Sequence, residues 1–207
     1  LTMNSDSLIM SRGGVIRARA QVDVLLGVLN AGAGVLSVNA TTGSITGNGI
    51  AAVDLVGGSL RLVAANAVGG PGTPLDTAVD KVAAQSGAGG IYLVDADLLT
   101  VGAISAVSFS RVQSSGVALI REDGALAGLV TTDGNGSIVQ ETIDGTLTVT
   151  SAVSAKGAGN IRLSAGGADG SLLVQSLVSS QTGHITLIGL KDVVQSSSGR
   201  VGTTGGS

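Results

Sequence analysis

The chain has 207 residues, of which 12% are charged and 43% apolar, and it carries a net charge of −3 with one Phe, one Tyr, no Trp and no Cys. The lack of cysteine excludes disulfides and iron–sulfur centres, and the lack of basic runs and the scarcity of aromatic residues argue against nucleic-acid binding. The most apolar stretch, residues 24–36, is too short to cross a bilayer, so we expect no membrane span.

A short motif recurs along the chain: a small residue, a free position, then a branched aliphatic residue. We take the aliphatic positions as structural core anchors, and their spacings are 20, 24, 31, 26, 21, 23 and 24 residues. A recurring interval of this size is typical of stacked repeat architectures. The anchors are Ile16, Leu36, Leu60, Ile91, Val117, Ile138, Ile161 and Ile185.

The residues that follow the anchors alternate between apolar and polar, as in residues 161–163 and 185–187, which is the pattern of a strand with one buried face. A second segment, residues 144–149, returns 25 positions later at residues 169–174. Few aromatics and 34 glycines fit a narrow aliphatic interior with many tight corners. The sequence therefore predicts an all-β fold, a parallel β-helix (β-solenoid) of about eight coils with roughly 24 residues per coil. We expect one solenoid segment over residues 1–207, forming part of a longer chain.

The longest spacing, from Leu60 to Ile91, contains a segment with helical features. Thr73 suits an N-cap, Pro74 suits the first helical position, and apolar residues from Leu75 to Ala83 make one stripe. The sequence predicts a short helix over residues 74–85, within an inserted excursion spanning residues 70–88.

Catalysis requires a constellation of reactive side chains, and the chain offers few. The best carboxylate pair for a glycosidase is Asp95 and Asp97, with Arg111 and Arg121 expected in neighbouring turns. The single histidine, His184, follows an anchor glycine, and the alternation points it to solvent. The motifs of polygalacturonase-like enzymes are missing, so we predict no enzyme and no catalytic or cofactor-binding residue.

Aspartate or asparagine recurs six to eight residues after most anchors. The simpler interpretation is that these side chains form Asx-turns that start the next strand. Calcium, which prefers hard oxygen ligands, is the alternative cofactor. The candidates for it are Asp133, Asp144 and Asp169, and the segments over residues 131–138 and 166–172 are similar to parts of calcium-binding nonapeptides.

Residues 74–84 followed by residues 89–102 read PLDTAVDKVAA and GGIYLVDADLLTVG. This block resembles blocks that recur in very large bacterial surface proteins, the filamentous-haemagglutinin-like adhesins with right-handed parallel β-helices. The resemblance covers about thirty residues strongly, and the rest only as generic coils. It implies an extracellular protein at the bacterial cell surface, and it assigns no binding residue to this chain.

Three functions follow as expectations. The first is a structural shaft segment of a secreted bacterial surface adhesin or extracellular fibre, without catalysis. The second is a self-assembling filament subunit that stacks head-to-tail through its terminal coils, and a remote third is a polysaccharide-active β-helix enzyme. The expected partners are neighbouring coils of the same or identical chains, and host or surface glycans.

Overall fold

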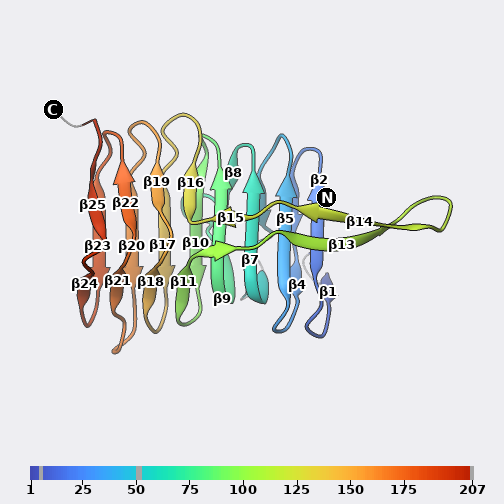
Figure 1. Cartoon of the computed structure of the whole chain (residues 1–207), viewed down its shortest axis with the longest axis horizontal. Helices are drawn as coiled ribbons and strands as arrows, with labels where there is room; N and C mark the ends of the chain where they lie inside the picture. Colours follow the sequence, from blue (N-terminus) through green and yellow to red (C-terminus); the bar gives the residue numbers. More distant parts are fainter. Residues whose placement is uncertain (5–6, 50–52, 206–207) are drawn as a thin grey trace.

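The chain forms a rod of stacked coils (Figure 1), an all-β parallel solenoid of about eight turns with about 23 residues per coil. The structure, a computed structural model, describes residues 1–4, 7–49 and 53–205. One sheet of 21 strands winds along the rod, and two small two-stranded sheets lie outside it. Within the described residues every regular element is a strand, and no helix is long and apolar enough to cross a membrane. The predicted fold class is confirmed.

One stack of parallel strands runs almost the whole length of the rod. Its strands are β3 (Val24–Leu26), β6 (Ile45–Gly47), β8 (Ala67–Val68), β10 (Gly90–Asp95), β17 (Ile138–Thr142), β20 (Ile161–Ala165) and β23 (Ile185–Gly189).

A second stack begins with β2 (Ile16–Ala20) and β5 (Val35–Ala40) and continues through the C-terminal parts of β7 (Leu55–Ala64) and β9 (Leu75–Ser86). Beyond β9 it divides into two rows. One row is β11 (Leu99–Val101), β18 (Leu147–Val149), β21 (Leu172–Val174) and β24 (Val193–Gln195), and the other is β16 (Leu129–Thr131), β19 (Val153–Ala155), β22 (Leu177–Ser180) and β25 (Arg200–Thr203).

A third, shorter stack closes the coils of the N-terminal half. It pairs β1 (Leu8–Met10) with β4 (Val28–Asn30), then β4 with the N-terminal part of β7 and β7 with that of β9. Strand β10 then pairs with β9 as well as with β8, so it spans two of the earlier faces.

The core is a column of fully buried aliphatic side chains inside these faces. Its largest members include Leu26, Leu36, Leu60, Ile91 and Leu129, each at most 1% exposed. Alternation along each strand sends one side chain in and the next out, so an aliphatic ladder fills the rod without aromatic residues.

The predicted helix over residues 74–85 is wrong, because this segment is the twelve-residue strand β9. Its inward positions are Leu75, Thr77 and Val79, then Val82, Ala84 and Ser86, so the alternation shifts phase at a corner near Asp80. That shift gives the apolar spacing of three to four residues that looks helical in the sequence. Strand β9 pairs with β7 on one side and with β10, β11 and β16 on the other, so ladder hydrogen bonds override the local helical signals.

The excursion expected over residues 70–88 is wrong for the same reason, since β9 is part of the coils. The eight anchors do not form one column either. Leu36 pairs with Ile16 and Leu60 in the second stack, whereas Ile91 pairs with Val68 and Ile138 in the first. The long Leu60-to-Ile91 spacing is therefore a change from one face of the rod to another.

Val117 is not a core anchor. It lies between strands β13 (Val107–Val112) and β14 (Ala118–Asp123), and it is 55% exposed. These strands form an antiparallel hairpin. In the first stack the successive partners Val24, Ile45, Val68, Ile91, Ile138, Ile161 and Ile185 are 21, 23, 23, 47, 23 and 24 residues apart. The interval of 47 contains the hairpin, whose length imitates one more coil in the sequence.

Candidate functional site

The hairpin is the one large departure from the plain coil in the described part of the chain. It leaves the rod after β11 and returns before β16, through the short antiparallel pair β12 (Ala103–Ile104) and β15 (Leu126–Ala127). Figure 1 shows that it runs along the rod across β7, β5 and β2 and extends past the N-terminal coil. At its return, Gly128 has φ +73°, and a Cβ there would collide with the carbonyl oxygen of Ala152.

The base of the hairpin packs on the rod through a small apolar cluster separate from the main core. Ile104 and Val107 pack with Ala83 of β9, and Val35 and Leu126 cover them. Beside this cluster lies a hollow of about 350 Å³ between residues 103–108 and an outward row on the coils, Val15, Val35, Ser59 and Lys81. The cluster holds the first part of the hairpin against the flank of the rod.

Asp123, at the end of β14, fixes the second hairpin strand on the coils. Its carboxylate accepts hydrogen bonds from Nε and Nη2 of Arg17 at 2.7 and 2.8 Å and from Oγ of Ser37 at 2.8 Å. Burial alone would raise the pKa of Asp123, but these hydrogen bonds and the charges of Arg17 and Arg61 outweigh it and lower that pKa. Asp123 therefore stays ionised and binds two successive coils.

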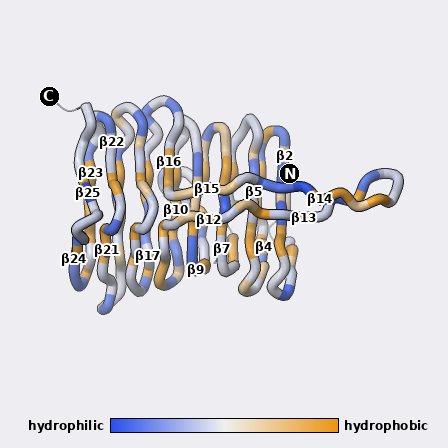
Figure 2. The backbone as a smooth tube through the Cα atoms, in the orientation of Figure 1, coloured by the Kyte–Doolittle hydropathy of each residue, from blue (hydrophilic) through white to orange (hydrophobic). Residues whose placement is uncertain are grey.

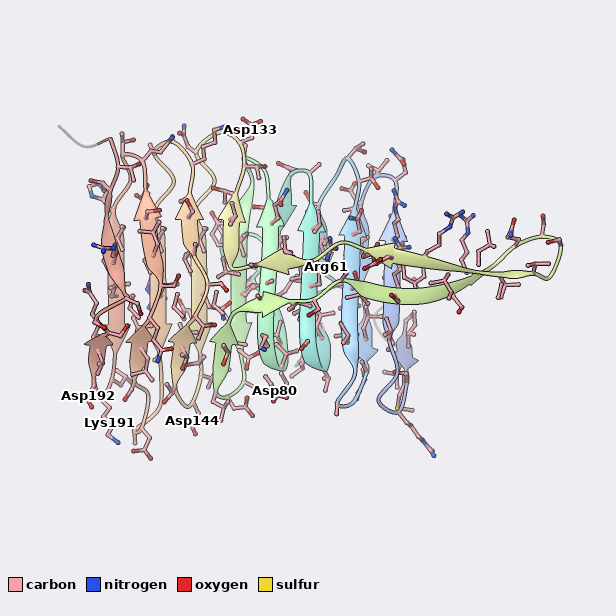
Figure 3. All side chains as sticks on the ribbon, viewed as in Figure 1. Arg61, Asp80, Asp133, Asp144, Lys191 and Asp192 are labelled. Atoms are coloured by element: carbon pink, nitrogen blue, oxygen red, sulfur yellow. The ribbon has the colours of Figure 1, made fainter. Side chains whose placement is uncertain are left out.

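Arg61 supplies the next contact along the rod. Its Nε donates to the carbonyl oxygen of Gly124 at 2.8 Å, and Figure 3 labels it between the two strands of the hairpin. Arg61 is 8% exposed, and its Nη1 has no hydrogen-bond partner among the described residues. Burial lowers the pKa of Arg61, opposed by the charge of Asp123. Arg17, Ser37 and Arg61 are register partners in β2, β5 and β7, so one outward row carries all three contacts.

Further out, the hairpin and β2 enclose a second hollow of about 310 Å³. Four arginines line it, Arg17 and Arg19 from β2 and Arg111 and Arg121 from the hairpin, together with Phe109, Glu122 and Asp123. The guanidinium carbon of Arg17 lies 4.2 Å from the centre of the Phe109 ring. The expectation that Arg111 and Arg121 lie in neighbouring turns is wrong, because both belong to the hairpin.

Asp95 and Asp97 do not form a catalytic pair. Asp95 is fully buried, and its carboxylate accepts hydrogen bonds from Oγ1 of Thr77 at 2.5 Å and from the backbone N–H of Val79 and Asp97 at 3.2 Å each. Asp97 is exposed. Burial raises the pKa of Asp95 to about 6, against the lowering effect of its hydrogen bonds. The Asp95–Asp97 contact is an Asx-type bond that turns the chain out of β10.

A second buried carboxylate, Asp54, carries no sequence signal. It is 3% exposed, and one of its oxygens accepts a hydrogen bond from the backbone N–H of Asp76 at 3.2 Å. Burial raises the pKa of Asp54 to about 6, with a smaller contribution from the charge of Asp76. The alternation of apolar and polar residues does not predict the burial of Asp54, because this residue lies at a corner immediately before β7.

The calcium candidates lie apart at turns on the edges of the rod. Figure 3 shows Asp133 and Asp144 at opposite edges. Asp133 accepts a hydrogen bond from the adjacent N–H of Gly134 at 2.7 Å, and Asp169 pairs with Lys191 at 3.2 Å. In the described ranges no three His, Cys, Asp or Glu side chains gather as metal ligands, so the structure does not bring this predicted set together.

The recurring Asp and Asn side chains have varied contacts. Asp23 accepts a hydrogen bond from the backbone N–H of Ser44 in the next coil, and Asn66 donates to Oγ of that residue. Asp123 belongs to the hairpin. His184 is exposed, as the alternation predicted.

Comparison of the chain with models of protein families, with curated proteins and with solved structures finds no match.

Proposed function

We propose that this chain is a structural shaft segment of a secreted bacterial surface adhesin or extracellular fibre, and that it performs no catalysis. The observation that carries the proposal is the unbroken parallel ladder, which links each coil to the next over the whole rod. A ladder of this kind resists extension because every coil between the two ends contributes backbone hydrogen bonds on both sides. The placement at the bacterial surface rests on the resemblance of residues 74–84 and 89–102 to adhesin blocks.

The burial of Asp95 weighs against the remote enzymatic alternative. A glycosidase needs both carboxylates accessible to the substrate on one surface. Asp95 is enclosed and hydrogen-bonded, whereas Asp97 faces solvent. This pair offers no acid and base to a sugar chain.

A second candidate, a filament subunit that stacks head-to-tail, is favoured by the two end coils. Strand β1 exposes Leu8, Ile9 and Met10 by 56%, 44% and 61%, and β24 exposes Val193 and Val194 by 48% and 49%. Edge strands with exposed apolar side chains are surfaces on which another coil can stack. The partner coil belongs to the same chain in a shaft and to a second molecule in a filament.

Electron microscopy of the native material, combined with the mass of the dissociated chain, tests the proposal. A chain much larger than 20.0 kDa that contains this segment and forms extended rods supports the shaft. Fibres that dissociate to chains of about this mass support the filament instead. Cleavage of an acidic polysaccharide by the purified protein would contradict both.

A further inference from the structure

The hollow between β2 and the hairpin gathers positive charge from two directions. Arg17 and Arg19 are two residues apart in β2, so both point outward from the rod. On the hairpin, Arg121 is the register partner of Phe109, and Arg111 lies two residues from Phe109 in β13. Cross-strand partners share a face, so Arg111, Arg121 and Phe109 lie on one side of the hairpin. That side faces β2, because the ring of Phe109 meets the guanidinium of Arg17.

The positive charge in this hollow is not balanced by the protein. Four guanidinium groups line it against two carboxylates, in a chain whose net charge is −3. Asp123 is already paired with Arg17. Among the described residues, no carboxylate lies within ion-pair distance of Arg19, Arg111 or Arg121. Guanidinium groups held close together without counter-charges repel one another, and an anion removes that repulsion.

The hollow also has the size and access of a binding site. Its volume of about 310 Å³ is at the lower end for small-ligand pockets and suits one sugar unit. Arg19, Arg111 and Arg121 are exposed, so a polymer can enter and continue along the rod. Figure 2 shows β14 as hydrophilic where it passes β2 and more hydrophobic toward the hairpin tip.

We propose that this hollow, which we call the arginine hollow (Arg17, Arg19, Phe109, Arg111, Arg121), binds a saccharide that bears carboxylate or sulfate groups. Arg19, Arg111 and Arg121 donate charge-assisted hydrogen bonds to the anionic oxygens, often in the two-pronged geometry of guanidinium. Arg17 keeps its ion pair with Asp123 and its contact with the Phe109 ring, and these contacts hold the hairpin against β2. Phe109 is the aromatic residue that lines the hollow, and Arg17 covers one face of its ring, so the hollow does not offer the row of aromatic rings on which successive nucleic-acid bases stack. The site is independent of the shaft proposal, since a rod of either candidate kind would carry it.

Titration calorimetry with defined trisaccharides tests the site on the full chain. The probes are trigalacturonate, a sulfated galactose trisaccharide and neutral galactotriose. We expect one or both anionic probes to bind and the neutral probe not to bind. The preferred anionic probe distinguishes carboxylate from sulfate as the source of the charge.

The test variant is Arg111→Gln/Arg121→Gln, which keeps the length and polarity of both side chains. We expect it to weaken binding by about tenfold or more for each lost guanidinium. The matched control is Arg162→Gln, a half-exposed arginine of β20 paired with Glu141 away from the hairpin, which should leave the affinity unchanged. Circular dichroism verifies that both variants retain the β fold.

Three results would overturn the assignment. The first is no binding of either anionic probe at concentrations up to about 1 mM. The second is binding that the double variant does not weaken. The third is binding of inorganic sulfate or of a single-stranded oligonucleotide as tight as that of the saccharides, with the same dependence on Arg111 and Arg121.

Discussion

Asp123 accepts two hydrogen bonds from the guanidinium of Arg17, which lies 106 residues earlier in the chain. The contact joins the end of the hairpin to β2, at the N-terminal end of the rod. Strands β2, β5 and β7 lie side by side on the face that the hairpin crosses. Asp123 and Arg17 have side chains 10% and 20% exposed, so water competes little for the pair. The orientation of the hairpin along the rod depends on this contact and on the apolar cluster at its base.

Replacement of Asp123 by Asn is expected to release the outer hairpin without unfolding the coils. The amide loses the ionic partner of Arg17, which weakens docking by about 1–3 kcal/mol. A hairpin that is no longer held against the rod opens locally more often, so limited trypsin digestion should cut it at Arg111 and Arg121 faster than in the parent protein. Glu141→Gln is the control, because it removes the partner of Arg162 far from the hairpin. Equal digestion rates for all three proteins would show that Asp123 does not hold the hairpin.

Removal of residues 103–126 is expected to leave a folded solenoid. The deletion places Gly102, Ala127 and Gly128 between β11 and β16, the same number of residues as Thr150, Ser151 and Ala152 between β18 and β19. Both flanking strands pair with β9, so the ladder passes beneath the hairpin without it. Circular dichroism and cooperative urea unfolding should persist. Loss of cooperative unfolding would mean that the hairpin is required to form the coils.

A charge placed in the aliphatic column should be far more costly than a change on the outer face. Ile161 is 1% exposed and stacks between Ile138 and Ile185. Ile161→Asp is expected to lower the free energy of unfolding by about 3–5 kcal/mol, because the carboxylate finds no partner there. Arg162→Thr, the residue already present at the paired position 186, should change it by less than about 1 kcal/mol. Urea denaturation measures both, and similar losses would refute the assigned register.

Stability is expected to fall as the pH rises from about 4 to about 6. Asp54 and Asp95 have pKa values raised by burial to about 6 in the folded state, from an ordinary value of 3.8. The folded state therefore binds more protons than the unfolded state between these pH values. Above about pH 6 both buried carboxylates are ionised, and the destabilisation by their buried charges reaches its full value. The pKa of Asp123 is lowered in the folded state, so its contribution to stability has the opposite pH dependence and is lost only as the pH falls below this range.

Urea unfolding at several pH values between 4 and 7 measures this dependence. The double variant Asp54→Asn/Asp95→Asn should flatten it, whereas Asp133→Asn at an exposed turn should not. A parent protein whose stability rises with pH over this range would contradict the assignment of both buried carboxylates.

Local patterns in the sequence were sufficient for the fold class and for the direction of most side chains. Alternation at residues 161–163 predicts the buried Ile161 and the outward Arg162, because a strand in a stack has one side facing the core and one side facing solvent. The recurrence of about two dozen residues predicts the solenoid, because each coil must match its neighbour to bury that face.

The tertiary structure decided what depends on which strand lies beside which. The phase of β9 follows from its partners on both sides, so a local stripe from Leu75 to Ala83 could not separate helix from strand. Val117 carries the anchor motif, yet the hairpin around it pairs with itself and leaves it in solvent. Arg17 and Asp123 give no sign of contact in the sequence, because only the return of the hairpin over β2 brings them together. The sequence by itself determined the repeating coil, and long-range strand pairing decided where the chain leaves the coil and what charge gathers there.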